Sequence, residues 1–401
     1  MANTLITPDI IAKEALMQLE NNLVMGKLVH REYRSEFKGG QGDSISIRKP
    51  VKFVASDGAT RVNQDVQEAK TTFTIDKRKH VSWKFSTEDL TLSVEQYSER
   101  YIRPAMIALS NQVDSDLTAL YKGIFQNVGT AGTAPSTFIN FGEASMRLDN
   151  SAVPTEDRRL VLNPRAHLYA ADLLKGLYNP ELVKGAVRGI SVGPLAGFET
   201  YMDQNVKKHT AGTWSAAGGA VNGASQNVTY ANAVNTYGST SQTLVVDGLS
   251  TNTVLAGDKF TIAGVYAVNP VSKETLDFLQ EFVVLTDATV ATGAASLTIS
   301  PAIIIDGAFQ TVSAAPADNA VITVSASYAA NLAFHKNAFG LVTVPLALPD
   351  GAAFKARESA NGYSVRVVKD YDIDSDDDVI RLDIMYGVKT LYPELACVLK
   401  G

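Results

Sequence analysis

The sequence predicts a mixed α+β chain that carries an inserted small all-β domain, and three patterns indicate this. Apolar residues recur every three or four positions within Ser93–Phe125, the spacing of one long amphipathic helix. Thr71–Phe85 alternates apolar and polar residues, as a half-buried strand does. From Ala211 to about Ser327 charges become rare, and short β-rich runs alternate with turn signals.

The long helix is expected to begin at Ser93, in a capping box with Gln96, and to end near Phe125. At about 1.5 Å per residue it would be roughly 50 Å long, which suits a strut better than a core helix. Pro104 cannot donate a hydrogen bond inside it, so either a bend or a break into two shorter helices is expected there. Its apolar face consists of Ile102, Met106, Leu109, Val113, Leu117, Leu120 and Ile124.

Composition and charge exclude several classes of protein. A chain of 401 residues is long enough for two or three domains. Its net charge of −6 argues against a protein that grips nucleic-acid phosphates, although a wall that merely encloses nucleic acid remains compatible. The single cysteine, Cys397, excludes an internal disulfide framework and is expected in a strand at 395–399. Without a secretory signal or a run of ~20 apolar residues, we expect a cytoplasmic protein that does not enter a membrane.

The N-terminal arm is predicted to be an amphipathic helix. Thr7 as N-cap, Pro8 at the first position and Asp9 beside it make a strong helix start. Apolar residues then line one face as far as Val24. This face packs either on its own domain or on a partner, and the pattern leaves both open.

A β-ribbon is predicted after Gly39–Gly42, with limbs at Ser44–Val54 and Thr71–Phe85 joined by the polar segment Ala55–Lys70. An isolated two-stranded ribbon is marginal in water and leaves unpaired edges. We therefore expect it to lie across a neighbouring subunit, the alternative being a ribbon folded back on its own body. Its candidate intersubunit contacts are Arg48, Lys49, Lys52, Asp57, Asp65, Glu68, Lys77, Arg78 and Lys79.

The inserted segment is predicted to be a small antiparallel barrel or sandwich. The expected strands are Thr243–Val246, Lys259–Ile262, Phe282–Thr286, Leu297–Ile299 and Val321–Val324. A charge-rich stretch within it, Lys273, Glu274, Asp277 and Glu281, is expected to form an exposed loop or helix turn. Its first three members, Lys273, Glu274 and Asp277, are further candidate contacts. Beyond the insert, strands are expected at Phe339–Leu348, Tyr363–Val368 and Val379–Leu391.

Candidate chemistry is sparse. Asp372, Asp374 and Asp376 have the spacing of a calcium loop with Asp383 at its twelfth place, but Asp377 stands where that loop needs glycine. We interpret the run as a solvated turn between two strands. The five histidines are scattered, and His167 is interpreted as a partly buried structural residue. We expect no catalytic residue, cofactor or metal.

Three runs in the tail carry a family resemblance, namely Asn331–Phe339, Val365–Ile373 and Ile380–Gly387. They resemble the coat (major capsid) proteins of short-tailed phages that contain an insertion domain. The run Gly257–Pro270 is similar to part of that domain. The order of arm, ribbon, long helix, mixed domain, insert and returning strands also agrees, so the resemblance covers essentially the whole chain.

The resemblance implies the tailed-phage capsid fold of the Hong Kong 97 type, with a long spine helix, an extended β-ribbon loop and an inserted small β-barrel. Mapped onto this chain, its parts are the N-terminal arm 1–42, the extended loop 43–86, the spine helix of the peripheral domain 87–126, a peripheral/axial domain 127–210, the inserted β-domain 211–330 and the return to the axial/peripheral core 331–401. Some relatives cross-link lysines of the loop to asparagines of a neighbour, and no motif here transfers that reaction.

The resemblance also implies partners. Hexamers and pentamers of the chain would form the icosahedral shell of a virion, enclosing double-stranded DNA without sequence-specific binding. A scaffolding protein and a portal protein would take part, with assembly in the host cytoplasm. Asp9, Glu14 and Glu20 on the arm are the candidate scaffold contacts.

Two other classes compete with this interpretation. The Ala-, Thr- and Gly-rich strands of the insert are also typical of a surface adhesin or fibre module, which would call for a secretory signal or a stalk pattern. A metal-dependent enzyme would have to be centred on Asp370–Asp383, and calcium binding would distinguish it.

Overall fold

The computed structural model describes residues 8–37, 43–55, 57–61, 63–64, 66, 68–86, 101–174, 192–237, 240–249, 252–290, 292–352, 354–374 and 377–401. The chain divides into two compact units. The first contains Met1–Ile45, Thr72–Leu117 and Phe339–Lys389, and the second contains Ser46–Thr71, Thr118–Ala338 and Thr390–Gly401. No helix in the described part of the chain has both the length and the apolar character needed to span a bilayer.

The first unit is built on a five-stranded sheet in which β16, β19, β18 and β17 follow one another and β3 pairs with β19. The strands are β3 (Lys77–Ser86), β16 (Phe339–Thr343), β17 (Phe354–Ala360), β18 (Tyr363–Asp372) and β19 (Asp377–Thr390). The β18–β19 pairing is antiparallel and places Asp372 opposite Asp377, so the acidic run lies at the ends of two paired strands. Asp374 is exposed between them, as predicted for a solvated turn, whereas Asp377 is buried and pairs with Lys84 at 2.7 Å, which the prediction missed. Asp376 lies outside the described residues.

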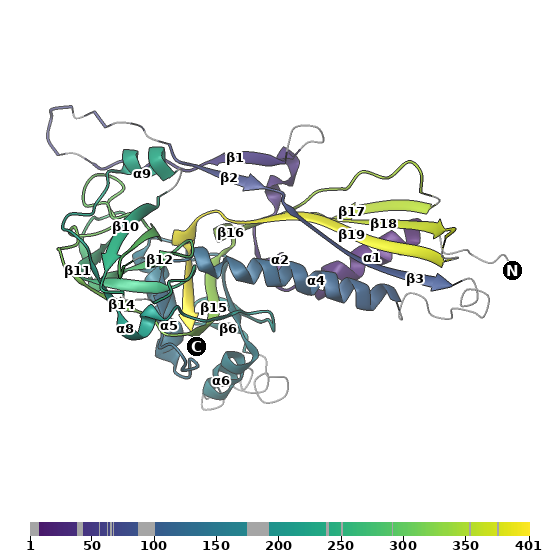
Figure 1. The fold of residues 1–401 in the computed structure, drawn as a ribbon, viewed down its shortest axis with the longest axis horizontal. Helices are drawn as coiled ribbons and strands as arrows, with labels where there is room; N and C mark the ends of the chain where they lie inside the picture. Colours follow the sequence, from purple (N-terminus) through teal and green to yellow (C-terminus); the bar gives the residue numbers. More distant parts are fainter. Residues whose placement is uncertain are drawn as a thin grey trace. The chain divides into compact units, whose positions relative to one another are not determined.

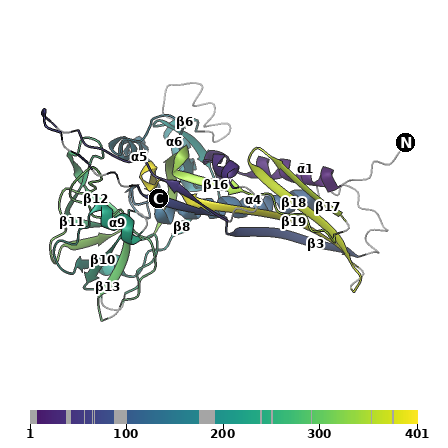
Figure 2. The ribbon, with the colours of Figure 1, turned by 90° about the horizontal axis from the view of Figure 1, so that it is seen from above.

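Helix α1 (Pro8–Asn22) lies along β17 and β18 (Figure 2). Its apolar face, which includes Ala15, Leu19 and Leu23 just beyond its end, is buried within this unit. The apolar face of the arm therefore packs on its own domain, which is one of the two interpretations that the sequence left open. The short helices α2 (Met25–Leu28) and η1 (Glu32–Glu36) follow.

The predicted long helix is present as α4 (Arg103–Thr118), followed by η3 (Ala119–Gly123). Figure 1 shows it as one extended rod. Its predicted apolar face is buried at Ile102, Met106, Leu109, Val113 and Leu117. The predicted start at Ser93 lies outside the described residues, and Pro104 is the second residue of α4. The structure therefore tests the face of this helix but neither its predicted length nor its bend.

The β-ribbon is shorter than predicted. β1 (Ser44–Arg48) and β2 (Lys70–Thr74) form a two-stranded sheet of their own. β3, the rest of the predicted second limb, pairs instead with β19 along ten residues, with Trp83 opposite Ile380. The prediction that Thr71–Phe85 is a single ribbon limb is thus wrong, because a long partner strand more than 290 residues away satisfies the hydrogen bonds of β3.

The second unit contains a sheet in the order β4-β20-β15-β5-β7-β6, with β8 pairing with β15. Its strands are β4 (Asn127–Val128), β5 (Arg158–Leu162), β6 (Pro194–Leu195), β7 (Phe198–Met202), β8 (Lys208–His209), β15 (Tyr328–His335) and β20 (Ala396–Lys400). α5 (Phe138–Asn150) and α6 (Pro164–Leu174) contribute to its apolar core, and Cys397 is buried there, as expected for a strand residue. Asn163 caps α6 through its side chain, which accepts from the Ala166 N–H at 2.7 Å.

A closed barrel in the order β10-β13-β12-β11-β14-β9 forms the other part of the second unit. Its strands are β9 (Gly219–Val221), β10 (Gln242–Asp247), β11 (Lys259–Val268), β12 (Thr275–Val284), β13 (Ala295–Ser300) and β14 (Val321–Val324). The short helices α8 (Trp214–Ala217) and α9 (Tyr230–Tyr237) accompany it, and η4 (Lys336–Ala338) and η5 (Pro393–Leu395) lie in the tail. Trp214, Phe260 and Phe282 pack in the barrel core. Of the two predicted alternatives, the insert is a barrel, and closure leaves it without an open edge.

Candidate functional site

The loop between β1 and β2 carries five of the twelve predicted contact residues, and a sixth, Arg48, ends β1. Arg48 Nη1 donates to Glu68 Oε2 at 3.2 Å across the loop, and both side chains are solvent-exposed. Asp57 is exposed, and Asp65 lies outside the described residues. An exposed ion pair of this kind contributes only about 0–1 kcal/mol, so the charges of the loop do little to hold its conformation.

Two lysines of the loop lie against aromatic rings of the second unit. Lys49 Nζ is 5.8 Å from the ring centroid of Tyr392, and Lys52 Nζ is 5.9 Å from that of Phe309. The Phe309 ring is in turn stacked on Tyr230 at 3.5 Å. The base of the loop therefore contacts its own subunit, which agrees with the folded-back alternative.

The loop also exposes apolar side chains that the sequence analysis missed. Phe53 is 64% exposed and Val66 is 63% exposed, although both are large apolar residues. Two hydrogen bonds between Val54 and Gln64 brace the loop near them. The sequence does contain a signal for them, because a phenylalanine and a valine stand in an otherwise polar segment, but the prediction considered only the charged residues.

Lys77 and Arg78 do not project from a ribbon. Lys77 Nζ lies 3.4 Å from Asp116 Oδ2 of α4, and Arg78 Nη2 lies 3.6 Å from Asp383 Oδ1 of β19. Lys79 stands opposite Ile384 in the same strand pair. The structure therefore places these three residues on a strand of the sheet of the first unit and not on the ribbon limb that was predicted to carry them.

Asp383 is the centre of a buried charge cluster. Its carboxylate accepts hydrogen bonds from Arg366 on β18 and from Arg381 on its own strand, the latter at 2.7 Å. Burial by itself would raise the pKa of Asp383, but these hydrogen bonds outweigh it and lower that pKa. The residue suggested as the twelfth ligand of a calcium loop is thus enclosed by arginines. Among the described residues, no three or more His, Cys, Asp or Glu side chains are grouped as metal ligands.

The acidic residues of the arm have different surroundings. Glu20 accepts two hydrogen bonds from the Asn361 side chain, each of 3.0 Å, at the turn between β17 and β18. Glu14 is partly exposed on α1. The Asp9 side chain lies outside the described part of the structure. Glu20 is therefore already engaged within the subunit.

The charge-rich segment of the insert is a tight turn followed by a strand, so the prediction of an exposed loop or helix turn holds for Glu274 and is wrong for Asp277 and Glu281. Asp277 and Glu281 both lie on β12, and Lys273 occupies the β11–β12 turn with φ +60°. Lys273 Nζ donates to the Ala308 carbonyl at 2.6 Å, whereas Glu274 and Asp277 are exposed. Alternation with Phe278 was a strand signal that counting charges concealed.

A buried polar network joins the barrel to the sheet of the second unit. His209 Nε2 donates to Asp258 Oδ1 at 2.8 Å, and the Tyr121 hydroxyl lies 3.0 Å from His209 Nδ1. Trp214 Nε1 donates to the other Asp258 oxygen at 2.7 Å. Burial, with the Asp258 charge nearby, raises the pKa of Tyr121 to about 12. Every member is buried and bonded, so this arrangement positions the barrel and offers no nucleophile to solvent.

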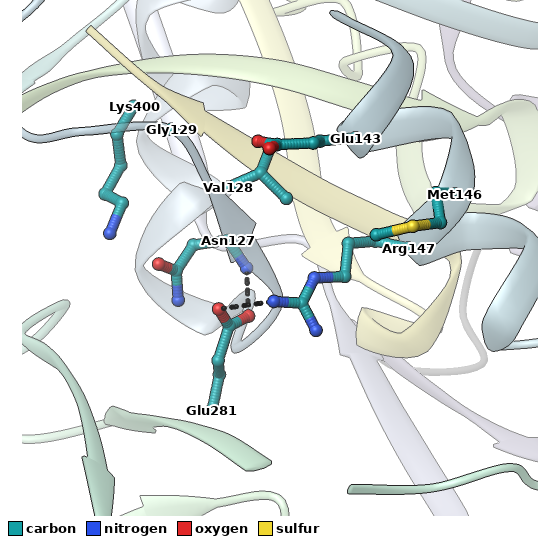
Figure 3. A pocket seen from close by; sticks show the side chains of 8 residues that line it. All are labelled: Asn127, Val128, Gly129, Glu143, Met146, Arg147, Glu281 and Lys400. Carbon is teal, nitrogen blue, oxygen red and sulfur yellow. Dashed lines mark hydrogen bonds and ion pairs between the residues drawn. The ribbon is translucent and has the colours of Figure 1, made fainter. Parts of the chain in front are cut away.

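A second cluster lies where α5, β4, β12 and β20 meet (Figure 3). Glu281 accepts the Asn127 backbone N–H at 2.5 Å and lies 3.5 Å from Arg147 Nη2. The Arg147 guanidinium also stacks on Phe278, 3.4 Å from its ring centroid. Nearby, Lys259 is completely buried and donates to the Ile124 carbonyl at 2.8 Å. Burial lowers the pKa of Lys259 to about 7.

Comparisons with known proteins identify the family. The family model "P22 coat protein - gene protein 5" matches residues 1–401, whereas no curated protein matches the chain. Among solved structures, a chain of Mycobacterium phage Che8 is similar, with 14% identity and a TM-score of 0.49 over 94% of this chain and 90% of that one. The capsid of cyanophage P-SCSP1u is 12% identical with a TM-score of 0.45, over 89% of this chain and 83% of that one. The mature capsid of bacteriophage PhiM1 is 11% identical with a TM-score of 0.42, over 90% of this chain and 82% of that one. On the strength of the whole-length family match, the chain belongs to the P22 coat protein family and is a structural, non-enzymatic capsid protein of a bacteriophage.

Proposed function

We propose that this chain is the major capsid protein whose hexamers and pentamers close an icosahedral shell around double-stranded phage DNA. The observation that carries the proposal is the family match over residues 1–401. The net charge of −6 suits a wall that encloses DNA without gripping its phosphates. The shell forms in the host cytoplasm and becomes part of the virion.

The proposal includes the Hong Kong 97 type of capsid fold. In this assignment residues 1–42 are the arm, 43–86 the extended loop, whose last strand β3 pairs with β19, and 87–126 the spine helix. Residues 127–210 and 331–401 form the peripheral and axial core around the inserted barrel at 211–330. The buried face of α4 and the closed barrel agree with this assignment.

Contacts between subunits are assigned chiefly to the loop. Phe53 and Val66 are exposed on a braced segment, and burying a large apolar side chain contributes about 1.5–3 kcal/mol. The charged residues of the same stretch of sequence would set the orientation of docking more than its strength; they are Arg48, Lys49, Lys52, Asp57, Asp65 and Glu68. On the barrel, Glu274 and Asp277 extend the same assignment.

The scaffolding and portal proteins are proposed as further partners. The acidic residues Asp9 and Glu14 of the arm, of which Glu14 is partly exposed on α1, would attract a basic scaffold helix. Glu20 contributes less, because it already accepts hydrogen bonds from Asn361.

The test is assembly of the full chain, co-expressed with its scaffolding protein and examined by size exclusion and negative-stain electron microscopy. Wild type is expected to form megadalton shells. The double variant Phe53→Ser with Val66→Ser is expected to remain a folded subunit, by circular dichroism, that fails to form them. Val321→Ser on β14 is the matched control, because Val321 is 62% exposed and Val66 is 63% exposed. Regular shells from the double variant would refute the loop assignment, and a wild type that never assembles would refute the function.

A further inference from the structure

A pocket of about 230 Å³ lies beside Arg147 in the second unit (Figure 3). α5 contributes Glu143, Met146 and Arg147 to its wall, β12 contributes Glu281 and β20 contributes Lys400. We propose that this pocket is a binding site for a small oxyanion, such as a phosphate or a carboxylate, held by Arg147 and Lys400. The proposal does not depend on shell assembly.

Two cations, Arg147 and Lys400, and two carboxylates, Glu143 and Glu281, line the pocket. Arg147, Lys400 and the buried Lys259 lie close enough to influence one another electrostatically, and Glu281 is the buried carboxylate that all three share. Burial lowers the pKa of Lys400 and of Lys259, because a buried ammonium group loses its hydration. A buried charge without a partner is costly, and a bound anion would relieve that cost.

The hydrogen-bond donors of the pocket are also short of acceptors. Arg147 has one carboxylate oxygen at 3.5 Å from Nη2, while its Nε and Nη1 are buried without an acceptor. Lys400 Nζ donates to the neutral Ser325 hydroxyl at 3.3 Å. Oxyanions present several acceptor oxygens and match the planar fork of a guanidinium, so this ligand class supplies what the two cations lack.

The space suits such a ligand. The volume is far above the ~15 Å³ that one water molecule needs, so a tetrahedral oxyanion fits together with water. Glu143 is the other acidic residue of the wall, and Figure 3 draws no hydrogen bond or ion pair from it to the other residues shown. If Glu143 turned inwards it would compete with the ligand, so its removal is expected to strengthen binding.

The experiment is isothermal titration calorimetry of the purified full chain with sodium phosphate at pH 7 and constant ionic strength, repeated with acetate as the carboxylate probe. Saturable binding is expected. Lys400→Gln should weaken it about tenfold or more, because a charge-assisted hydrogen bond is lost. Met146→Trp should abolish binding by filling the pocket with both cations in place. Glu143→Gln should tighten binding. Lys208→Gln on β8 is the matched control, because it removes one exposed positive charge away from the pocket.

The outcomes separate the alternatives. Phosphate binding without acetate binding assigns the site to tetrahedral oxyanions, and binding of both assigns it to oxyanions generally. Absence of saturable heat with either probe would overturn the proposal, as would equal binding by wild type, Lys400→Gln and Met146→Trp. Because thermal unfolding without phosphate reports folding directly, a variant that is merely misfolded is recognised independently.

Discussion

Replacing Asp383 by asparagine tests whether a buried carboxylate organises the sheet of the first unit. The Asp383 side chain is fully buried. It pairs with three arginines on adjacent strands, Arg78 on β3, Arg366 on β18 and Arg381 on β19. Breaking a buried ion pair by removing one partner costs about 3–5 kcal/mol, because the remaining charge is left uncompensated. Arg78 and Arg381 are 47% and 38% exposed, so solvent screens part of the loss. We therefore expect the lower end, about 3 kcal/mol in the free energy of unfolding.

The effect should depend on pH in a defined direction. Burial raises the pKa of Asp383, but the hydrogen bonds from Arg366 and Arg381 outweigh burial, so the folded-state pKa lies below the unfolded value. A carboxylate with a depressed folded pKa contributes its full stability above the unfolded pKa of about 3.9 and loses it as the pH falls through the folded pKa. The difference between wild type and Asp383→Asn should accordingly be complete at pH 7 and should shrink below about pH 4.

Urea unfolding followed by tryptophan emission measures this difference. In a Trp214→Phe background only Trp83 reports, and Trp83 lies opposite Ile380 on the strand that carries Asp383. Asp378→Asn is the matched control, because Asp378 pairs with Lys369 at 3.1 Å and both side chains are partly exposed. That control should cost about 0–1 kcal/mol. If Asp383→Asn costs no more than the control at pH 7, the reasoning about the buried cluster is refuted.

Three further perturbations test other parts of the fold. Phe282→Ala in the barrel core should cost about 3–5 kcal/mol by opening a cavity, measured by urea unfolding and loss of near-ultraviolet circular dichroism; a loss below 1 kcal/mol would contradict it. Asp114→Ala should cost about 1–2 kcal/mol and speed amide exchange at Val24 and Gly26, whose N–H groups donate to its carboxylate at 2.7 and 3.0 Å; unchanged exchange there would argue against the cap. Burial lowers the pKa of Lys259 to about 7, so above pH 7 the unfolded state binds more protons than the folded state. The free energy of unfolding of wild type should therefore rise between pH 7 and 10, by up to about 1.4 kcal/mol per pH unit. Lys259→Met should lack this rise, and parallel pH profiles of wild type and variant would refute the argument.

Local patterns predicted the elements of this fold well. The helical periodicity identified the buried face of α4 at Met106, Leu109 and Val113, because a period of 3.6 residues depends only on neighbours in sequence. In the insert, each of the five predicted strands overlaps an observed one, because turn residues mark where strands end.

Pairing between distant segments could not be predicted in the same way. The alternation in β3 correctly indicated a strand, but nothing local specified that β19 and not β1 would be its partner. For the same reason Glu281 was taken for a surface residue, since its partners Arg147 and Asn127 lie more than 130 residues earlier in the chain. Residues such as Lys273 and Asp277 were judged by charge alone, which reports solvation but not strand geometry.

The buried polar contacts of the second unit concentrate where the barrel joins the sheet. Asp258 receives hydrogen bonds from His209 and Trp214, and the next residue, Lys259, donates to the Ile124 carbonyl. Tyr328, where the chain leaves the insert, donates to the Gly257 carbonyl at 3.1 Å. Apolar contacts tolerate sliding and rotation, whereas hydrogen bonds between buried groups are satisfied in few orientations and are costly when unmade. The barrel folds around its own apolar core, but buried hydrogen bonds fix its orientation relative to the sheet of the second unit. A capsid subunit needs this property, because an error in the orientation of an inserted domain would recur in every copy of the shell.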